Sequence, residues 1–329
     1  MRRREFISLL GGMAFVKSVV LAIPAIAQQP GKVPRVGILT PAETDATPIF
    51  GGLRGGLRDM GYIEGATIVL EFRFAKGNLD ALPGLAEELV RLPVDLIVTD
   101  GNNAARAALD ATRTVPIVMG IAADALESGL VPSTARPGGN ITGMTLGRIE
   151  QAGKRLQLLM QAFPGISRVV VLLNPSALSG QLNLRVTEDA AKTLGMTVSP
   201  LAANNPDELR ALEPRRLLGA DGLVVLPDAM FWNHRATITG LVNAARVPAL
   251  YPEREYADDG GLIAYGPNIP DSFRRAAGYV ARILRGTKPG DLPIDEASKF
   301  DFVINLRTAR ALGIAISPDF LSSANEVIE

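Results

Sequence analysis

The hydrophobic positions of this chain follow two alternating periodicities. Short apolar or alternating runs predict strands, and between them apolar residues recur every three or four positions, as in amphipathic helices. In the first half we expect strands at 33–40, 67–74, 94–99 and 115–119, and helices at 49–60, 79–91, 102–112 and 124–133. Because one helix follows each strand, the pattern predicts a parallel, doubly wound sheet.

The second half repeats this alternation. We expect strands at 168–173, 196–201, 222–226, 248–251 and 261–265, and helices at 149–162, 178–194, 206–218 and 234–245. A long helix at 271–285, a linker at 287–296, a strand at 300–304 and a helix at 306–312 complete the chain. The two halves match in architecture without a residue-level repeat, which predicts a second parallel-sheet lobe.

The stretch 129–144, GLVPSTARPGGNITGM, separates the two halves. Its prolines and glycines interrupt regular structure, although residues 140–144 could form one short strand. A break with a complete α/β run on either side is where one lobe is expected to pass to the next. We therefore expect the functional site in a cleft between the two lobes.

The N-terminus has the pattern of an export signal. Arg2, Arg3 and Arg4 precede an apolar segment, and Ala25-Ile26-Ala27 supplies a small-x-small cleavage box. We interpret residues 1–27 as a cleaved signal peptide that sends the protein to the periplasm. Arg3-Arg4-Glu5-Phe6-Ile7 also fits a twin-arginine pattern. The alternative is a buried N-terminal helix, although a cleavage box seldom follows such a basic start.

Composition narrows the class of protein. A chain of 329 residues with 47% hydrophobic residues can build two domains. Its 34 basic and 34 acidic residues balance, so no nucleic-acid surface is expected. The chain has no cysteine, which excludes disulfides, thiolate chemistry and a cysteine-linked lipid anchor.

Candidate binding residues follow from the expected sheets. Ligands of open parallel sheets bind at the carboxyl ends of the strands. This rule points to the loops 40–44, 99–103, 120–124, 174–179, 227–233 and 251–254, and Tyr265 is added beside an expected lobe crossover. The candidates are Thr40, Thr44, Asp100, Asn102, Ile121, Asn174, Asp228, Trp232, Tyr251 and Tyr265.

These residue types could recognise a small polar solute. Asp100 or Asp228 could pair with an amine, and the helix beginning near Asn102 offers backbone N–H groups to an anion. Trp232, Tyr251 and Tyr265 could supply apolar walls, with Phe231 beside them. Each has a plainer interpretation. The polar residues could cap helices or make loop hydrogen bonds, Trp232 could pack at the surface, and Tyr265 could pack at a hinge.

Catalytic and cofactor motifs are weak. His234 is the only histidine, and no G-x-S-x-G elbow is present for a catalytic triad. The glycine-rich run 51–56 does not fit G-x-G-x-x-G and is interpreted as a site of close helix packing. No carboxylate or histidine cluster has metal-ligand spacing. We therefore expect neither enzyme activity nor a cofactor.

Four stretches carry a family resemblance: GYIEGATIVLEFRFAKGNLDALPGLAEELVRLPVDLIV, GLVPSTARPGGNITGM, YPEREYADDGGLIAYGPN and KFDFVINLRTARALGIAI. With them the chain resembles the substrate-binding proteins of ABC transporters that have the type I periplasmic-binding-protein fold. The resemblance implies two doubly wound lobes joined by three crossovers, near 144–147, 266–268 and 297–299. Lobe I would comprise 33–145 plus 268–298, and lobe II 146–267 plus 299–329. Related chains often carry Asp-Pro-Val where this chain has 124–128, a segment that borders the expected cleft, so its ligand need not be the one that its relatives bind.

The resemblance implies a periplasmic protein that captures a small, amino-acid-like organic solute. It would deliver the solute to an ABC permease in the inner membrane and act as a monomer. A ligand sensor for a signalling receptor and a secreted α/β enzyme stay open as alternatives. A cytoplasmic regulator with the same fold is disfavoured, because no helix-turn-helix precedes Val33.

Overall fold

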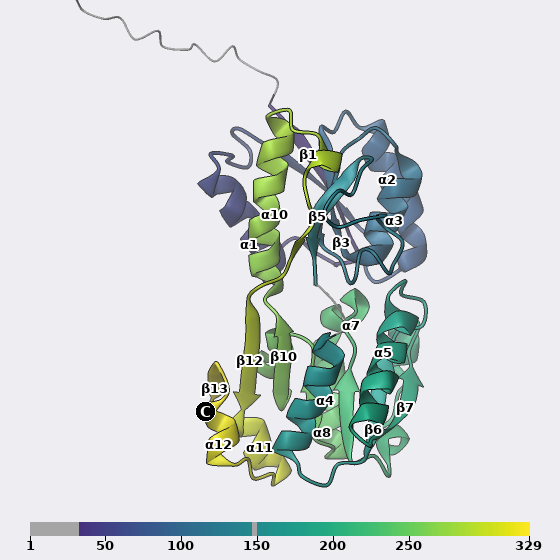
Figure 1. Cartoon of the computed structure of the whole chain (residues 1–329), viewed down its shortest axis with the longest axis vertical. Helices are drawn as coiled ribbons and strands as arrows, with labels where there is room; N and C mark the ends of the chain where they lie inside the picture. Colours follow the sequence, from purple (N-terminus) through teal and green to yellow (C-terminus); the bar gives the residue numbers. More distant parts are fainter. Residues whose placement is uncertain (1–32, 147–149) are drawn as a thin grey trace, which may run out of the picture. The chain divides into compact units, whose positions relative to one another are not determined.

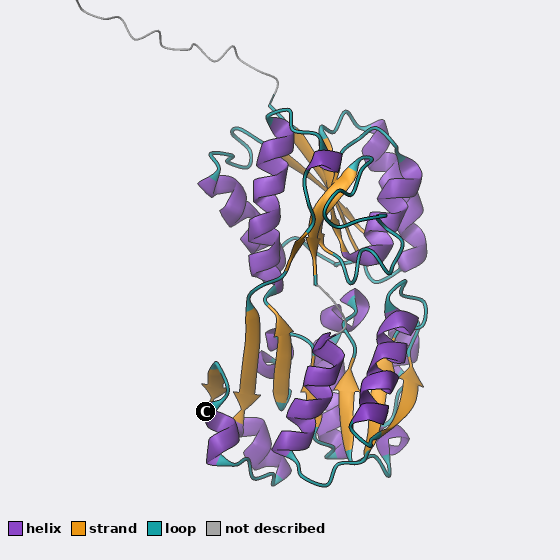
Figure 2. Ribbon diagram, in the orientation of Figure 1, coloured by secondary structure: helices purple, strands orange, loops and turns teal. Residues whose placement is uncertain are grey.

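The computed structural model describes residues 33–146 and 150–329. The predicted signal peptide, 1–27, and part of the predicted crossover at 144–147 lie outside the described residues. Within the described residues, no helix combines the length and apolar character that a membrane span needs. The described chain folds around two sheets, each with helices on both faces (Figures 1 and 2).

The first sheet has six strands that all run parallel. In spatial order they are β11 (Asp295–Glu296), β5 (Ile141–Thr145), β4 (Ile117–Ile121), β3 (Leu96–Asp100), β1 (Arg35–Thr40) and β2 (Val69–Phe74). Its central strands β1, β3 and β4 are almost entirely buried. The predicted parallel sheet is confirmed, and β5 confirms the short strand considered for 140–144.

Alternate residues of these strands face opposite helix layers. Ile38 and Val98 pack in one apolar cluster with α1 (Pro48–Asp59) and α10 (Ile269–Leu284). Their sequence neighbours Leu39 and Ile97 pack in a second cluster with α2 (Leu82–Arg91) and α3 (Gly101–Ala111). The period-2 alternation of a strand thus covers both faces of the sheet. A 3-10 turn, η1 (Leu79–Ala81), leads into α2.

Helices α1 and α10 lie side by side, although more than 200 residues separate them in sequence (Figure 1). A Cβ atom at Gly52 would lie 2.1 Å from the carbonyl oxygen of Pro270, and one at Gly56 would lie 2.3 Å from that of Arg274. Only glycine allows the two backbones to approach so closely. The interpretation of the 51–56 run as a helix-packing site is therefore confirmed.

The second sheet has seven strands. In spatial order they are β13 (Glu326–Ile328), β12 (Phe300–Asn305), β10 (Ile263–Pro267), β9 (Ala249–Tyr251), β8 (Gly222–Val225), β6 (Arg168–Leu173) and β7 (Thr197–Ala202). All neighbours run parallel except β10 and β12, which are antiparallel. The prediction of a parallel sheet holds for the rest. The exception arises because the chain leaves by β10, visits the first sheet, and returns by β12.

Helices cover both faces of the second sheet as well. On one face lie α4 (Glu150–Ala162), α5 (Gly180–Thr193), α11 (Leu306–Leu312) and α12 (Pro318–Ser322). The other face carries α8 (Arg235–Ala245) and the short α9 (Arg254–Asp258). The chain passes from the first sheet to the second after β5 and returns between β10 and α10. After η3 (Pro289–Asp291) and β11 it passes to the second sheet again, where β12 begins.

Two helix predictions are wrong. Residues 124–133 form turns, because Gly129 adopts a φ of +64° and Asp124 bonds to the backbone N–H groups of Leu126 and Glu127. The predicted helix 206–218 is two pieces, α6 (Pro206–Arg210) and the 3-10 turn η2 (Pro214–Leu217). Pro214 cannot continue a helix from the preceding turn, so a new piece begins at it.

Candidate functional site

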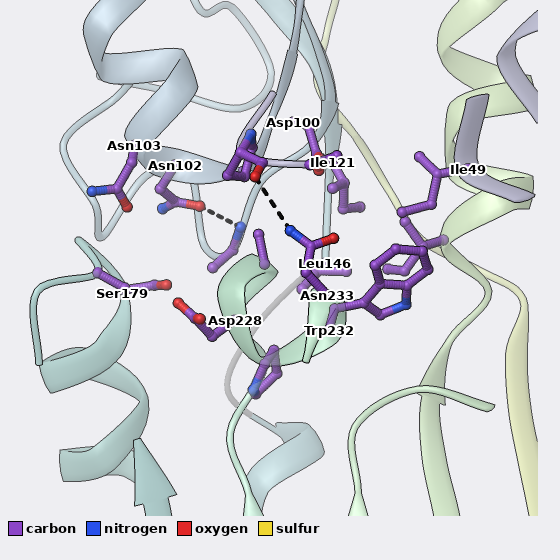
Figure 3. A pocket seen from close by; sticks show the side chains of 18 of the residues that line it. Ile49, Asp100, Asn102, Asn103, Ile121, Leu146, Ser179, Asp228, Trp232 and Asn233 are labelled. Atoms are coloured by element: carbon purple, nitrogen blue, oxygen red, sulfur yellow. Dashed lines mark hydrogen bonds between the residues drawn. The ribbon is translucent and has the colours of Figure 1, made fainter. Parts of the chain in front are cut away.

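A cavity of about 110 Å³ lies where the carboxyl ends of strands from both sheets face one another (Figure 3). From the first sheet it is lined by the residues after β1, β3 and β4, and from the second by those after β6, β8 and β9. Ile49 of α1, Ile269 of α10 and Leu146, which follows β5, complete the wall. The strand-end rule thus places a site at the edge where the two sheets meet.

Asp100 ends β3 and is 9% exposed. Thr40, fully buried at the end of β1, donates a hydrogen bond of 2.8 Å from Oγ1 to Oδ2 of Asp100. Among the described residues no group bonds to Oδ1. Burial raises the pKa of Asp100 to about 6, and the bond from Thr40 lowers it in part. Asp100 therefore brings a weakly solvated carboxyl group to the cavity wall.

Asp228 faces the cavity from the other sheet. It precedes α7 (Ala229–Asn233), and its Oδ1 accepts the backbone N–H of Phe231 at 3.0 Å as a helix cap. The side chain of Asn174, at the end of β6, donates to Oδ2 at 3.1 Å. Burial raises the pKa of Asp228 to about 6, while the bonds to Phe231 and Asn174 lower it. Two neighbouring strands thus hold this carboxyl group in place.

A third carboxyl group, that of Glu253, lines the cavity after β9. It is 7% exposed, and its Oε2 is buried with no hydrogen-bond partner among the described residues. Burial raises the pKa of Glu253 to about 8, the charge of Arg155 lowers it, and Glu255 and Asp228 raise it. Burial therefore favours the neutral form of Glu253, which can both donate and accept a hydrogen bond.

The start of α3 is held in place by its own side chains. Asn102 is 4% exposed; its Oδ1 accepts the N–H of Ala123 at 2.6 Å, and its Nδ2 donates to Oγ of Ser128 at 2.5 Å. Gly101 has a φ of +83°, a conformation that favours glycine. Asn102 therefore ties the loop after β4 to α3, in addition to lining the cavity.

Two hydrogen bonds join the halves of the site. The backbone N–H of Leu178 donates to Oδ1 of Asn103 at 3.1 Å. Nδ2 of Asn233 donates to the carbonyl oxygen of Pro41 at 3.2 Å, one of the dashed lines in Figure 3. Both asparagines also line the cavity. These bonds place side chains of each half against the backbone of the other.

Trp232 is the aromatic residue of the cavity wall. It is 9% exposed, and the guanidinium carbon of Arg235 lies 4.6 Å from the centre of its ring. Its indole Nε1 is buried, and no group in the described part of the chain bonds to it. Together with Ile49, Ile121 and Leu146 it gives the cavity an apolar surface beside the carboxyl groups.

The structure brings five of the ten candidates into this wall: Asp100, Asn102, Ile121, Asp228 and Trp232. Thr40 and Asn174 do not line the cavity, but each donates a hydrogen bond to one of the two aspartates that do.

The remaining three candidates lie elsewhere. Thr44 is exposed and accepts the N–H of Ala46, which is the loop interpretation. Tyr251 is fully buried, with its ring stacked on Tyr256 at 5.1 Å. Tyr265 stacks on Phe300 beside a crossover, which is the hinge-packing interpretation.

Sequence reasoning did not single out Glu253, Asn103, Ser179 or Asn233, which also line the cavity. All four belong to the strand-end loops that the sequence had indicated. Choosing by residue type within each loop missed them. Among the described residues that line the cavity there are three carboxyl groups and no lysine, arginine or histidine. The described residues also hold no group of three or more side chains suited to a metal ion.

The arrangement corresponds to a known family. The sequence model of the ABC transporter substrate binding protein family matches residues 35–328. The chain belongs to this family. As a member, it is a solute-binding protein of the extracytoplasmic class, and its fold is that of type I periplasmic binding proteins. The family binds a small-molecule solute and passes it to a transporter.

Individual relatives can be compared with this substrate-binding protein. A tyrosine-binding protein of Clostridioides difficile is 25% identical over 79% of this chain and 75% of its own length. A conserved domain protein from Vibrio cholerae has a TM-score of 0.85 at 25% identity, covering 90% of this chain and 100% of its own. An ABC domain in complex with L-Trp from Streptococcus pneumoniae has a TM-score of 0.84 at 23% identity, with the same coverage.

Proposed function

We propose that this substrate-binding protein captures an amino-acid-like solute in the cavity and delivers it unchanged to an ABC permease. The observation that carries the proposal is the pair of carboxyl groups of Asp100 and Asp228, which face the cavity from the two sheets without a basic side chain among its described lining residues. A solute with a protonated amine would supply the missing positive charge. A charge-assisted hydrogen bond in a site that excludes water is stronger than one in solvent.

The apolar part of the wall supports the same solute class. Trp232, Ile49 and Ile121 offer a surface for an apolar side chain next to the polar anchor points. Ligand sites of this kind combine an apolar lining with a few polar groups that fix orientation. The names of the tyrosine-binding relative and of the L-Trp complex agree with an aromatic amino acid, which makes tyrosine and tryptophan the first solutes to test.

The location of the site supports binding by closure. We take lobe I as 33–145 plus 268–298 and lobe II as 146–267 plus 299–329, joined by three crossovers that act as a hinge. Asp100 would hold the amine from lobe I and Asp228 from lobe II, so the bound solute would favour the closed arrangement of the lobes. Closure would create the surface that a permease recognises. We further propose that the protein acts as a monomer in the periplasm after residues 1–27 are removed.

Isothermal calorimetry with the mature protein and the standard amino acids tests the proposal. We expect saturable, one-to-one binding of at least one amino acid and full recovery of that amino acid after the protein is denatured. Binding without recovery would favour an enzyme over a carrier. No binding by any amino acid would contradict the proposed solute class.

A further inference from the structure

A second, smaller cavity of about 40 Å³ adjoins the main one. The two cavities share Ala123, Leu146 and Pro227 as wall residues. The remaining walls of the small cavity come chiefly from α4 and α5, with Arg155 of α4 among them. The volume exceeds what one water molecule needs and suits a group the size of a carboxylate, but it has no room for a ring.

Arg155 is 3% exposed, and no residue that the structure describes forms an ion pair with it. Its Nε donates to the carbonyl oxygen of Tyr265 at 3.0 Å, and its Nη2 donates to Oε1 of Gln151 at 3.2 Å. Among the described residues no carboxylate lies within 4 Å of its guanidinium group. A guanidinium has five N–H donors, and a buried charge is normally paired. Arg155 therefore has unused donors beside a cavity.

Among the described residues, no other polar group of the small cavity forms an ion pair with Arg155. Asp124 lines the cavity too, but its Oδ1 already accepts the N–H groups of Leu126 and Glu127. Asn183 and Thr187 are uncharged. Burial lowers the pKa of Arg155 to about 10, so it remains a cation at neutral pH.

The charge of Arg155 also reaches the main cavity. Arg155 lowers the pKa of Glu253, which lines the main cavity, and Asp228 raises it. Glu253 therefore lies within electrostatic range of both the guanidinium and the carboxyl group proposed to hold the amine. An acidic wall and a neighbouring buried cation together match a solute that carries both an amine and a carboxylate.

We propose that the small cavity is an anion subsite in which Arg155 binds a carboxylate. This inference rests on the proposed function and deepens it, because it makes a zwitterion the preferred solute. The carboxylate could belong to the solute in the main cavity or to a free small acid, and the experiment separates these two sources. The alternative is that Arg155 only fixes α4 to β10 through the carbonyl oxygen of Tyr265.

The test compares affinities for L-tyrosine and L-tyrosine amide, which keeps the amine and the ring but lacks the carboxylate. L-Tryptophan and its amide form a second pair. For the wild-type protein we expect the acid to bind at least about tenfold more tightly than the amide, as a charge-assisted pair would give. In Arg155→Met this ratio should fall close to one. Arg185→Met is the matched control, because Arg185 is exposed on α5; it should keep the wild-type ratio.

A purely structural role would lower the melting temperature of ligand-free Arg155→Met without changing the acid-to-amide ratio, and that result would overturn the inference. So would a wild-type ratio near one. If Arg155→Met does not fold, Arg155→Lys serves instead, because it keeps the charge but not the planar fork; its ratio should still fall severalfold, and an unchanged ratio would count against an arginine subsite.

Acetate shows whether the subsite binds a free acid or only the carboxylate of the solute. It also separates failure of the subsite from failure of the proposed function. If acetate alone raises the melting temperature of the wild type but not of Arg155→Met, the subsite binds free acids as well. If no amino acid or amide binds, the proposed function fails, and the anion subsite is then judged by acetate alone. In that case the absence of any effect of acetate on the melting temperature would overturn the subsite. Equal binding of acid and amide overturns the subsite and leaves the proposed function in place.

Discussion

Oγ1 of Thr40 lies 2.8 Å from Oδ2 of Asp100 and donates a hydrogen bond to it. The two residues end the adjacent parallel strands β1 and β3, so the sheet itself sets their separation. The bond fixes one carboxylate oxygen and leaves the other for the cavity. Asn174 holds Asp228 in the same way from the end of β6. Each lobe thus orients one carboxyl group through a side chain from a neighbouring strand.

Asp100→Asn should weaken binding of an amine-bearing solute by about tenfold or more, because it replaces a charge-assisted hydrogen bond by a neutral one. The fold should be retained, since the amide has nearly the same size and burial disfavours the carboxylate. Calorimetry with the bound amino acid measures the change. Asp110→Asn is the control, because Asp110 is exposed on α3, the helix that follows Asp100. Equal affinities of the two variants would contradict the role of Asp100.

Asp228 has a structural role that can be separated from binding. Asp228→Asn keeps a side-chain oxygen for the N–H of Phe231 and loses the bond from Asn174, so it should weaken the solute affinity with a smaller loss of stability than Asp228→Ala. Asp228→Ala removes the helix cap as well and should lower the free energy of unfolding by about 1 kcal/mol. Denaturant titration and calorimetry on both variants measure the two effects. If Asp228→Asn bound the solute as tightly as the wild type, the amine contact would be refuted.

The stability of the ligand-free protein should fall as the pH rises from about 5 to 8. Asp100 and Asp228 have pKa values raised to about 6 and Glu253 to about 8, so the folded state binds more protons than the unfolded state across this window. Raising the pH removes these protons and charges groups that burial disfavours. Melting temperatures across the window measure the effect. This account would be contradicted if the stability of the wild type rose with pH and if a variant neutralised at Asp100, Asp228 and Glu253 showed the same rise.

Solute affinity should have the opposite pH dependence. An amine pairs with the ionised forms of Asp100 and Asp228, whose pKa values are about 6, so binding should weaken as the pH falls from 7 to 5. Above pH 7 the affinity should change little until the amine itself loses its proton. Calorimetry at several pH values gives the profile. In Asp100→Asn one titrating group is gone, and the dependence should be shallower; an unchanged profile would exclude Asp100 as its source.

The close approach of α1 and α10 gives a prediction about stability. Gly56→Ala would place a Cβ atom 2.3 Å from the backbone oxygen of Arg274, so the free energy of unfolding should fall by about 1–3 kcal/mol. Gly51→Ala is the control on the same helix, because its Cβ atom would meet no atom within 4 Å. That variant should be neutral or more stable by about 0.5–1 kcal/mol. Equal stability of the two variants would show that the helices separate at little cost.

The strand periodicity predicted both sheets because each central strand is buried on both faces and reads as an apolar run. It also placed Asp100 and Asp228 correctly at strand ends, from which the cavity follows. It could not tell which face a side chain occupies at the end of a short strand. Tyr251 therefore looked like a wall residue, although its ring is stacked under Tyr256 in the core.

Other failures have local causes. The antiparallel pairing of β10 with β12 depends on where the chain re-enters the lobe, which periodicity does not encode. Glu253 was missed because Tyr251 was the residue chosen from its loop, and only the fold shows that Glu253 is buried beside the cavity. The same holds for Arg155. Only the fold shows that no described carboxylate lies beside its guanidinium group.

Native mass spectrometry of the mature protein, purified without denaturation, tests the central claim most directly. The claim predicts a one-to-one adduct whose mass is that of an amino acid or a close analogue. The adduct should be released intact, its removal should lower the melting temperature, and adding the same compound should restore it. Absence of any adduct, together with a melting temperature that no amino acid changes, would contradict the claim.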